Sequence, residues 1–293
     1  MAITIERVGT TKDILGEGPV WDEAEQALYW VDSFARVVHR MDHATGELRN
    51  WGVPEQIGSM ALREGGGAVV AMETGFHFLD LENGGCAPVV DPEADKPRTR
   101  FNDGKVDRQG RFLAGTIMLG EPRRPRVAAL HRLDPDLSTR TLDPDIALSN
   151  GPCFSPDGRT LYFADTDAAA IYAYDYDPAT GEAANRRVHI DLGTEYGGGS
   201  DGATVDADGT LWTALVFASK IGRFDPDGRL MQTIDMPVQL PTSVMFGGPD
   251  LDELYVTSLS AGRLRPSYGP MDGALLRITG HGARGLPEPR FKG

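Results

Sequence analysis

Short apolar segments alternate with polar turns along the whole chain. Residues 161–164 (Leu-Tyr-Phe-Ala) follow the turn 155–158 (Ser-Pro-Asp-Gly), and residues 211–214 (Leu-Trp-Thr-Ala) follow 206–209 (Asp-Ala-Asp-Gly). Glycine tolerates a positive φ and aspartate bonds to nearby backbone, so both tetrapeptides favour tight turns between strands. No segment keeps a helical period between two capping signals. The pattern therefore predicts an all-β protein.

A second pattern recurs at longer range: a carboxylate or amide residue stands before a glycine that opens an apolar segment. The motif occurs at Glu17-Gly18, Asp103-Gly104, Asn150-Gly151 and Asp201-Gly202. Residues 57–61 and 242–246 hold the same place without an acid. The six starts at 17, 57, 103, 150, 201 and 242 are 40, 46, 47, 51 and 41 residues apart, which is the period of a β-propeller blade.

We therefore predict a six-bladed β-propeller of four-stranded blades. Residues 3–5 are expected to add a strand to the last blade, which closes the ring and removes an exposed edge. The predicted blades are approximately residues 17–56, 57–97, 98–147, 148–197, 198–240 and 241–287.

Equivalent positions of all blades surround one central channel in a propeller. The four oxygen-bearing side chains of the motif would therefore converge on a single axis. Hard oxygen donors suit calcium, magnesium or manganese, with zinc also possible. The alternative is that each polar residue merely closes the entrance of a strand, as Asp-Gly pairs do in turns.

The composition argues against several classes of binding partner. The net charge of −14 argues against nucleic acid and anionic membranes, because both bind basic surfaces. No apolar run approaches the roughly 20 residues of a membrane-spanning helix, and the N-terminus lacks the layout of a signal peptide. Two cysteines, Cys86 and Cys153, are too few for a disulfide framework. We expect a cytoplasmic protein whose 293 residues form a single domain, as a monomer or weak homodimer.

Two other motifs could indicate a different function. Residues 198–202 fit the G-x-S-x-G nucleophile pattern, and residues 197–202 fit G-x-G-x-x-G. Both functions require a following helix, whereas residues 203–209 read as a strand and a turn. These glycines are better explained by a loop that passes close to the channel mouth. The six histidines show no spacing typical of metal ligands.

Longer motifs resemble the SMP-30/gluconolactonase family, also described as regucalcin-like, over essentially the whole chain and in order. They are Glu17-Gly18-Pro19-Val20-Trp21, residues 100–107, Gly115-Thr116, residues 149–152, Asp201-Gly202, residues 246–251 and 254–258, and residues 287–291.

The resemblance implies a propeller that binds one divalent cation and hydrolyses sugar lactones to aldonic acids. Matched position by position, it implies that the metal ligands are Glu17, Asn150 and Asp201. It implies a substrate-binding set of Arg100, Asn102 and Glu121, although the match around Glu121 slips by about one residue. Calcium, zinc, manganese, magnesium and iron(II) are all candidate ions, with calcium or zinc favoured.

The residue types suit this chemistry. A divalent cation can polarise a lactone carbonyl, and Asp201 can take a proton from the attacking water. Side chains alternate along a strand, so Asn102 is expected to point inward and Asp103 to have a structural role beside the site. The competing hypothesis is a non-catalytic scaffold or calcium-binding protein with a structural ion. Arg100 and Asn102 favour the lactonase, because a structural ion needs no arginine beside it.

Overall fold

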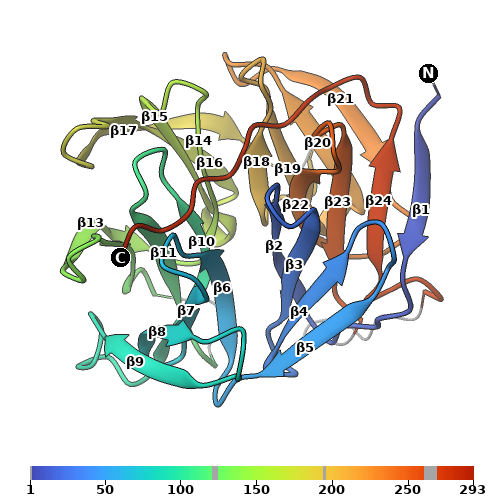
Figure 1. The fold of residues 1–293 in the computed structure, drawn as a ribbon. Coiled ribbons are helices and arrows are strands. Elements are labelled where there is room, and N and C mark those ends of the chain that lie inside the picture. Colours follow the sequence, from blue (N-terminus) through green and yellow to red (C-terminus); the bar gives the residue numbers. More distant parts are fainter. Residues whose placement is uncertain (1, 121–124, 194–195, 261–268) are drawn as a thin grey trace.

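Six four-stranded antiparallel sheets surround one axis in the computed structural model, as Figure 1 shows, which confirms the predicted propeller. The structure describes residues 2–120, 125–193, 196–260 and 269–293. Five blades pair their strands in chain order, from an innermost strand beside the channel to an outermost strand at the rim, and the sixth takes its outermost strand from the N-terminus. Within the described residues, no helix has the length and apolarity to cross a membrane.

The first three blades each use four consecutive strands. Blade one has β2 (Gly16–Asp22), β3 (Ala27–Asp32), β4 (Val37–Asp42) and β5 (Leu48–Gly52). Blade two has β6 (Ile57–Leu62), β7 (Ala68–Met72), β8 (Gly75–Leu79) and β9 (Cys86–Val90). Blade three has β10 (Thr99–Val106), β11 (Phe112–Met118), β12 (Ala128–Leu133) and β13 (Thr139–Ile146).

The next two blades follow the same order, with a short 3-10 helix after the second strand. Blade four has β14 (Ser149–Phe154), β15 (Thr160–Asp165), η1 (Thr166–Ala168), β16 (Ala170–Tyr176) and β17 (Ala183–Asp191). Blade five has β18 (Ala203–Val205), β19 (Leu211–Leu215), η2 (Val216–Ala218), β20 (Lys220–Phe224) and β21 (Leu230–Asp235).

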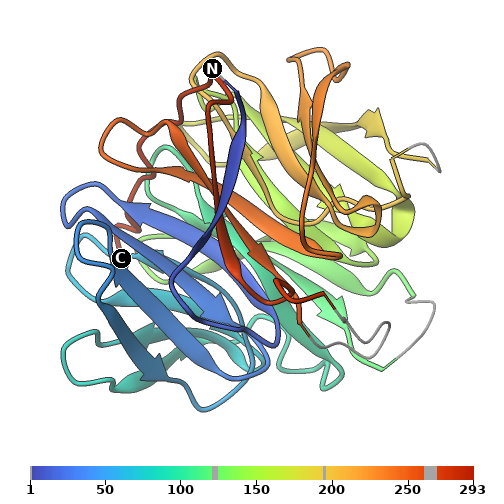
Figure 2. The ribbon, with the colours of Figure 1, turned by 90° about the vertical axis from the view of Figure 1, so that its right-hand side faces the viewer.

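The sixth blade joins the two ends of the chain. Its strands are β22 (Pro241–Gly247), β23 (Glu253–Ser258), β24 (Leu275–Thr279) and β1 (Thr4–Val8). The antiparallel register runs from Thr4 opposite Thr279 to Val8 opposite Leu275, and β1 lies along the blade edge in Figures 1 and 2. The predicted closure by the N-terminal segment is confirmed. It covers an edge of β24 that would otherwise expose its hydrogen-bonding groups.

The apolar core is divided into six layers, one between each pair of neighbouring blades. Between blades one and two, for example, Tyr29 and Val38 share a cluster with Met60 and Val70. The layer between blades six and one closes the circle and contains Trp30. Because every sheet is buried on both faces, the inner strands are apolar along nearly their whole length. This burial explains why the sequence shows continuous apolar segments there rather than alternation.

Five of the six innermost strands contain a register shift at the position of the recurring motif. The pairing is interrupted between Glu17 and Val20, Ile57 and Ser59, Phe101 and Gly104, Asn150 and Cys153, and Pro241 and Val244. In blade five, β18 begins only after Asp201-Gly202. A β-bulge changes the direction of a side chain relative to the strand, and bulges are frequent beside functional sites. The repeated motif therefore marks a bulge at the channel mouth.

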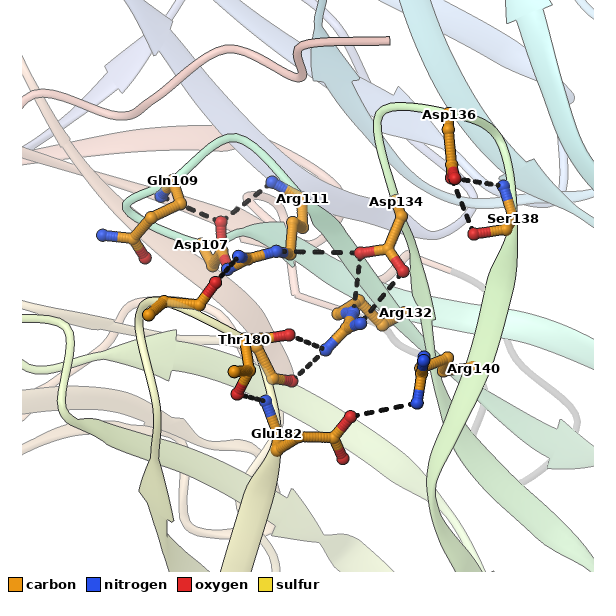
Figure 3. A network of polar contacts seen from close by, with 12 residues as sticks. Asp107, Gln109, Arg111, Arg132, Asp134, Asp136, Ser138, Arg140, Thr180 and Glu182 are labelled. Carbon is orange, nitrogen blue, oxygen red and sulfur yellow. Dashed lines mark hydrogen bonds and ion pairs between the residues drawn. The ribbon is translucent and has the colours of Figure 1, made fainter.

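Arginines of blade three hold the β16–β17 turn of blade four, as Figure 3 shows. Arg111 Nη1 and Nη2 donate to the carbonyl oxygens of Pro178 and Ala179 at 3.0 and 2.9 Å. Buried Arg132 donates to the carbonyl oxygens of Thr180 and Gly181 and pairs with Asp134. These bonds satisfy turn carbonyls that no strand pairs, and they join neighbouring blades by polar as well as apolar contacts.

The C-terminal segment crosses the end of the propeller opposite to the motif, and Figure 1 shows it in dark red across the blades. The carbonyl of Arg284 accepts from Ala207 of blade five, and the carbonyl of Phe291 accepts from Glu64 of blade two. Phe291 is fully buried between blades two and three. Glu288 lines a small channel cavity of about 20 Å³ and lies 4.0 Å from Lys105. The segment therefore covers this end of the channel.

Replacing Phe291 by alanine should lower the free energy of unfolding by about 3–5 kcal/mol, because a fully buried ring is lost from the core. A urea titration would show this as a lower midpoint with an unchanged slope. Phe217→Ala is the matched control, since that ring is 46% exposed and its loss should cost about 0.5 kcal/mol or less. Equal midpoints for the two variants would contradict a structural role of the tail.

Candidate functional site

The predicted site residues lie at or just before the starts of innermost strands. Glu17 is the second residue of β2, Asn150 is the second residue of β14, and Asp201 lies two residues before the start of β18. Arg100 and Asn102 both lie on β10. Four blades therefore contribute to one end of the channel, as the repeat pattern predicts.

Backbone segments approach each other closely at this end. Gly151 has a φ of +49°, and a Cβ there would lie 2.7 Å from the carbonyl oxygen of Asp201. A Cβ on Gly58 would overlap the carbonyl oxygen and Cα of Asn102. Only glycine fits at either position without moving the neighbouring strand. At these two positions the lack of space requires glycine and keeps the neighbouring strands close together.

A directed chain of hydrogen bonds connects three blades across the site. Arg100 Nη1 donates to Asn102 Oδ1 at 3.1 Å, and Asn102 Nδ2 donates to Asn150 Oδ1 at 2.6 Å. Asn150 Nδ2 then donates to Thr166 Oγ1 at 2.8 Å, and Thr166 donates to the carbonyl oxygen of Ser200 at 2.6 Å. These bonds fix the orientation of both amides. One lone pair of Asn150 Oδ1 is used and the other can accept a further ligand.

The amide of Asn102 is largely occupied by the protein itself. Its Nδ2 also donates to the carbonyl oxygen of Ser149 at 2.8 Å, so both amide hydrogens have partners. Arg100 Nη1 additionally donates to the carbonyl oxygen of Phe101 at 2.7 Å. Asn102 can therefore offer a ligand only its Oδ1, while it orients Arg100 and Asn150.

Three carboxyl groups face the same region: Glu17 and Asp103, which are buried, and Asp201, which is partly buried. Burial raises the pKa of Glu17 well above its ordinary value, and the charges of Asp201 and Asp103 raise it further. Burial also raises the pKa of Asp201, followed by the charge of Asp103. The pKa of Asp103 is raised by burial, although Lys105 and the N–H groups of Gly104 and Gly151 oppose this shift. The cluster thus concentrates negative charge that the fold leaves incompletely balanced.

The donor set suits a divalent cation in type and in charge. Among the described residues, no lysine, arginine or histidine forms an ion pair with Glu17, Asp103 or Asp201. Carboxylate and amide oxygens are the ligands of hard cations, and a bound cation would relieve the repulsion. No group of three or more histidine, cysteine, aspartate or glutamate side chains in the described ranges is arranged to hold an ion. The ligand set that the family resemblance implies differs from such a group, because it has only two carboxylates and takes its third ligand from the amide of Asn150.

A cavity of about 480 Å³ opens beside Arg100, between blades two and three. Phe101 and Thr116 line its inner wall, and Glu73 and Glu93 belong to the surrounding loops. Its volume lies within the range typical of small-molecule sites. The loops that form it join strands at the same end of the propeller as the carboxyl cluster.

The structure brings together five of the predicted residues and also shows contributors that the sequence did not reveal. Glu121 lies outside the described residues. Thr166 connects Asn150 to blade five, and nothing in its local sequence signals that role. Asp103 accepts from the N–H of Gly151 at 2.9 Å and so supports the neighbouring blade, in line with the structural role expected for it.

The fold and this end of the channel define a six-bladed propeller whose mouth presents carboxylate and amide oxygens beside a cavity that Arg100 helps to line. Residues 15–260 match the SMP-30/gluconolactonase/LRE-like region. The chain belongs to this family.

Relatives in the family match nearly the full chain. Regucalcin of Xenopus laevis is 39% identical over 300 residues, covering 100% of this chain and 99% of that protein. The 6-deoxy-6-sulfogluconolactonase of Pseudomonas putida is 35% identical over 292 residues, covering 99% of both. The crystal structure of the calcium-binding protein regucalcin from Agrobacterium tumefaciens superposes with a TM-score of 0.89 at 27% identity, covering 97% of this chain and 96% of that one.

Replacing Asp201 by asparagine should raise the free energy of unfolding of the chelator-treated protein by about 1–2 kcal/mol, because one of three mutually repelling charges is removed. Denaturant titration in excess EDTA measures this. Asp107→Asn is the matched control: Asp107 is also buried but bonds to Arg111 and Tyr176 at 2.8 Å. Its loss should destabilise by about 3 kcal/mol. A similar destabilisation in both variants would contradict the repulsion.

Proposed function

We propose that the chain is a metal-dependent lactonase that hydrolyses an aldonolactone to the aldonic acid. The observation that carries the proposal is the convergence of Glu17, Asn150 and Asp201 beside Arg100 and a cavity of small-molecule size. The name of the Pseudomonas relative supports a sugar lactone as the substrate class. The polar wall suits a polyhydroxylated molecule better than an apolar ester.

Glu17, Asn150 and Asp201 would hold the ion, with calcium or zinc as the favoured candidates. When bound, the ion supplies Lewis-acid polarisation of the lactone carbonyl. Asn150 is suited to this position because Asn102 and Thr166 fix its Oδ1 toward the site. Asp103 accepts from the N–H of Gly151 and so keeps the preceding residue, Asn150, in place.

Asp201 would act as the general base. A water oxygen forms a bond to the lactone carbonyl carbon while Asp201 Oδ takes one of its protons. Collapse of the tetrahedral intermediate breaks the bond to the ring oxygen, which receives that proton and leaves as a hydroxyl group. In the metal-free protein, burial and the charge of Asp103 raise the pKa of Asp201. A bound cation would lower this pKa, so Asp201 would act as a weaker base than its metal-free environment suggests.

Arg100 would orient the lactone from the cavity side. Its Nη1 is held by Phe101 and Asn102, so the guanidinium plane has a defined direction at the cavity wall. A planar guanidinium can donate to sugar hydroxyls or to the carboxylate of the product. The Oδ1 of Asn102 can accept from a substrate hydroxyl in addition to its bond from Arg100.

A second candidate function is calcium binding without catalysis, which the regucalcin names of several relatives favour. In that case the ion would serve structure or calcium handling alone. The two functions differ in one measurement, the release of acid from a lactone.

Purified protein loaded with calcium or zinc should release acid from at least one of glucono-, galactono-, xylono- and arabinonolactone, and EDTA should remove the activity. Asp201→Ala should lose the metal by elemental analysis, since one of three protein ligands is removed. Activity on none of these lactones, with retained calcium, would favour the calcium-binding function. Unchanged metal content in Asp201→Ala would contradict the ligand assignment.

Arg100→Ala should lower kcat/KM by roughly ten- to a hundredfold, because a charged hydrogen bond to the substrate contributes about 1.5–3 kcal/mol. Metal content and the urea midpoint show whether the site and fold persist in the variant. Arg140→Ala is a suitable control, because that arginine is exposed and its one ion pair among the described residues is with Glu182, at the far side of blade three. An unchanged kcat/KM in Arg100→Ala would remove Arg100 from the substrate site.

A further inference from the structure

The cavity beside Arg100 has an acidic wall. It lies between the β7–β8 turn of blade two and the segment that leads into β10 of blade three. Six ionisable side chains line the described part of the wall: Glu55, Glu73, Asp91, Glu93, Lys96 and Arg100. Four are acidic and two are basic, so the formal charge of this lining is −2.

One of the two cations is already matched by a carboxylate. Lys96 Nζ donates to Glu93 Oε1 at 2.9 Å and to the carbonyl oxygen of Val127 at 3.0 Å. Burial opposes ionisation of Glu93, but bonds from His131, Lys96 and Thr99 lower the pKa of Glu93 to about 2. Glu93 is therefore charged across the physiological range. Lys96 contributes no excess positive charge to the cavity.

The other three carboxylates form no ion pair with any described residue. Glu55 accepts from the N–H and hydroxyl of Thr74 at 3.0 and 2.9 Å, and Asp91 accepts from the N–H of Glu93 at 2.9 Å. Glu73 accepts a single longer bond, from the N–H of Gln56 at 3.3 Å. Hydrogen bonds from neutral groups position these carboxylates but leave their charge in place.

We propose that this acidic wall selects lactones without a charged substituent and rejects those that carry a phosphate or sulfonate, with Glu73 as the main determinant. The inference rests on the proposed lactonase function. A carboxylate accepts hydrogen bonds from sugar hydroxyls, which are donors. A phosphate or sulfonate offers oxygen acceptors and a negative charge, so it meets unmatched acceptors and like charge on this wall. Juxtaposed like charges oppose association and reduce its rate.

The test compares D-glucono-1,5-lactone with its 6-phosphate, using the full-length metal-loaded protein at a mildly acidic pH that limits spontaneous hydrolysis. The wild type should prefer the neutral lactone by at least about tenfold in kcat/KM. Added salt should raise kcat/KM for the phosphate and leave that for the neutral lactone nearly unchanged, because ions screen the repulsion.

Substitutions in the acidic wall test whether it causes the preference for the neutral lactone. Glu73→Gln should reduce the preference roughly fourfold, which corresponds to one unit charge a few ångströms away in a solvated site, and Glu73→Lys should reduce it further. Asp91→Asn keeps an acceptor for Glu93 and provides an independent second variant. Glu82→Gln is the matched control, because that exposed residue lies in the β8–β9 turn at the opposite end of the same blade. It should leave the preference unchanged.

The outcomes separate this inference from the function on which it rests. Equal hydrolysis of the two lactones, or an unchanged preference in both Glu73→Lys and Asp91→Asn, would overturn the inference while leaving the lactonase intact. Hydrolysis of neither lactone would count against the proposed function, and the inference would be rejected with it. A preference for the phosphate would reverse the assigned role of the wall.

Discussion

The close approach of the innermost strands at one end of the channel is the constraint on which the site depends. At Gly58 and Gly151 the neighbouring strand occupies the volume of a side chain. The bulges in five innermost strands change the direction of the preceding polar residues at the same level. Carboxylates from three blades are thereby held near one another, so their repulsion follows directly from the geometry of the ring. Under the proposed function, a bound cation would relieve this repulsion and stabilise the protein.

The number of blades, their boundaries and the closing strand could all be predicted from sequence. Turn residues such as Asp208-Gly209 act locally, and the repeat period fixes how many units must fit around an axis. The bulges could not be predicted, because a register shift depends on the pairing with the next strand. The alternation rule placed Asn102 inward and Asp103 away, yet both reach blade four because the register breaks between Phe101 and Gly104.

Candidate site residues could be named from the sequence, but the hydrogen bonds that connect them could not. The family motifs indicate Glu17, Asn150 and Asp201 by position, whereas the hydrogen-bond chain from Arg100 to Thr166 is formed by residues far apart in sequence. The charge of the cavity wall is equally non-local, because Glu55, Glu73 and Asp91 come from separate loops of blade two. Single acidic loop residues carry no pattern that distinguishes a cavity wall from an ordinary exposed turn.

The C-terminal crossing also constrains how the chain can reach its native state during synthesis. Phe291 packs in the apolar layer between blades two and three, and β1 pairs with β24. Both this early layer and the first strand are therefore completed only by residues that are synthesised last. Blades two and three can form their own sheets as they leave the ribosome, but the layer between them lacks one of its rings until residue 291 is available. Such long-range pairing is intrinsically slow and leaves apolar surface exposed meanwhile. We therefore expect chaperones to bind the exposed apolar surface of the nascent chain until the last blade and the C-terminal segment have been translated.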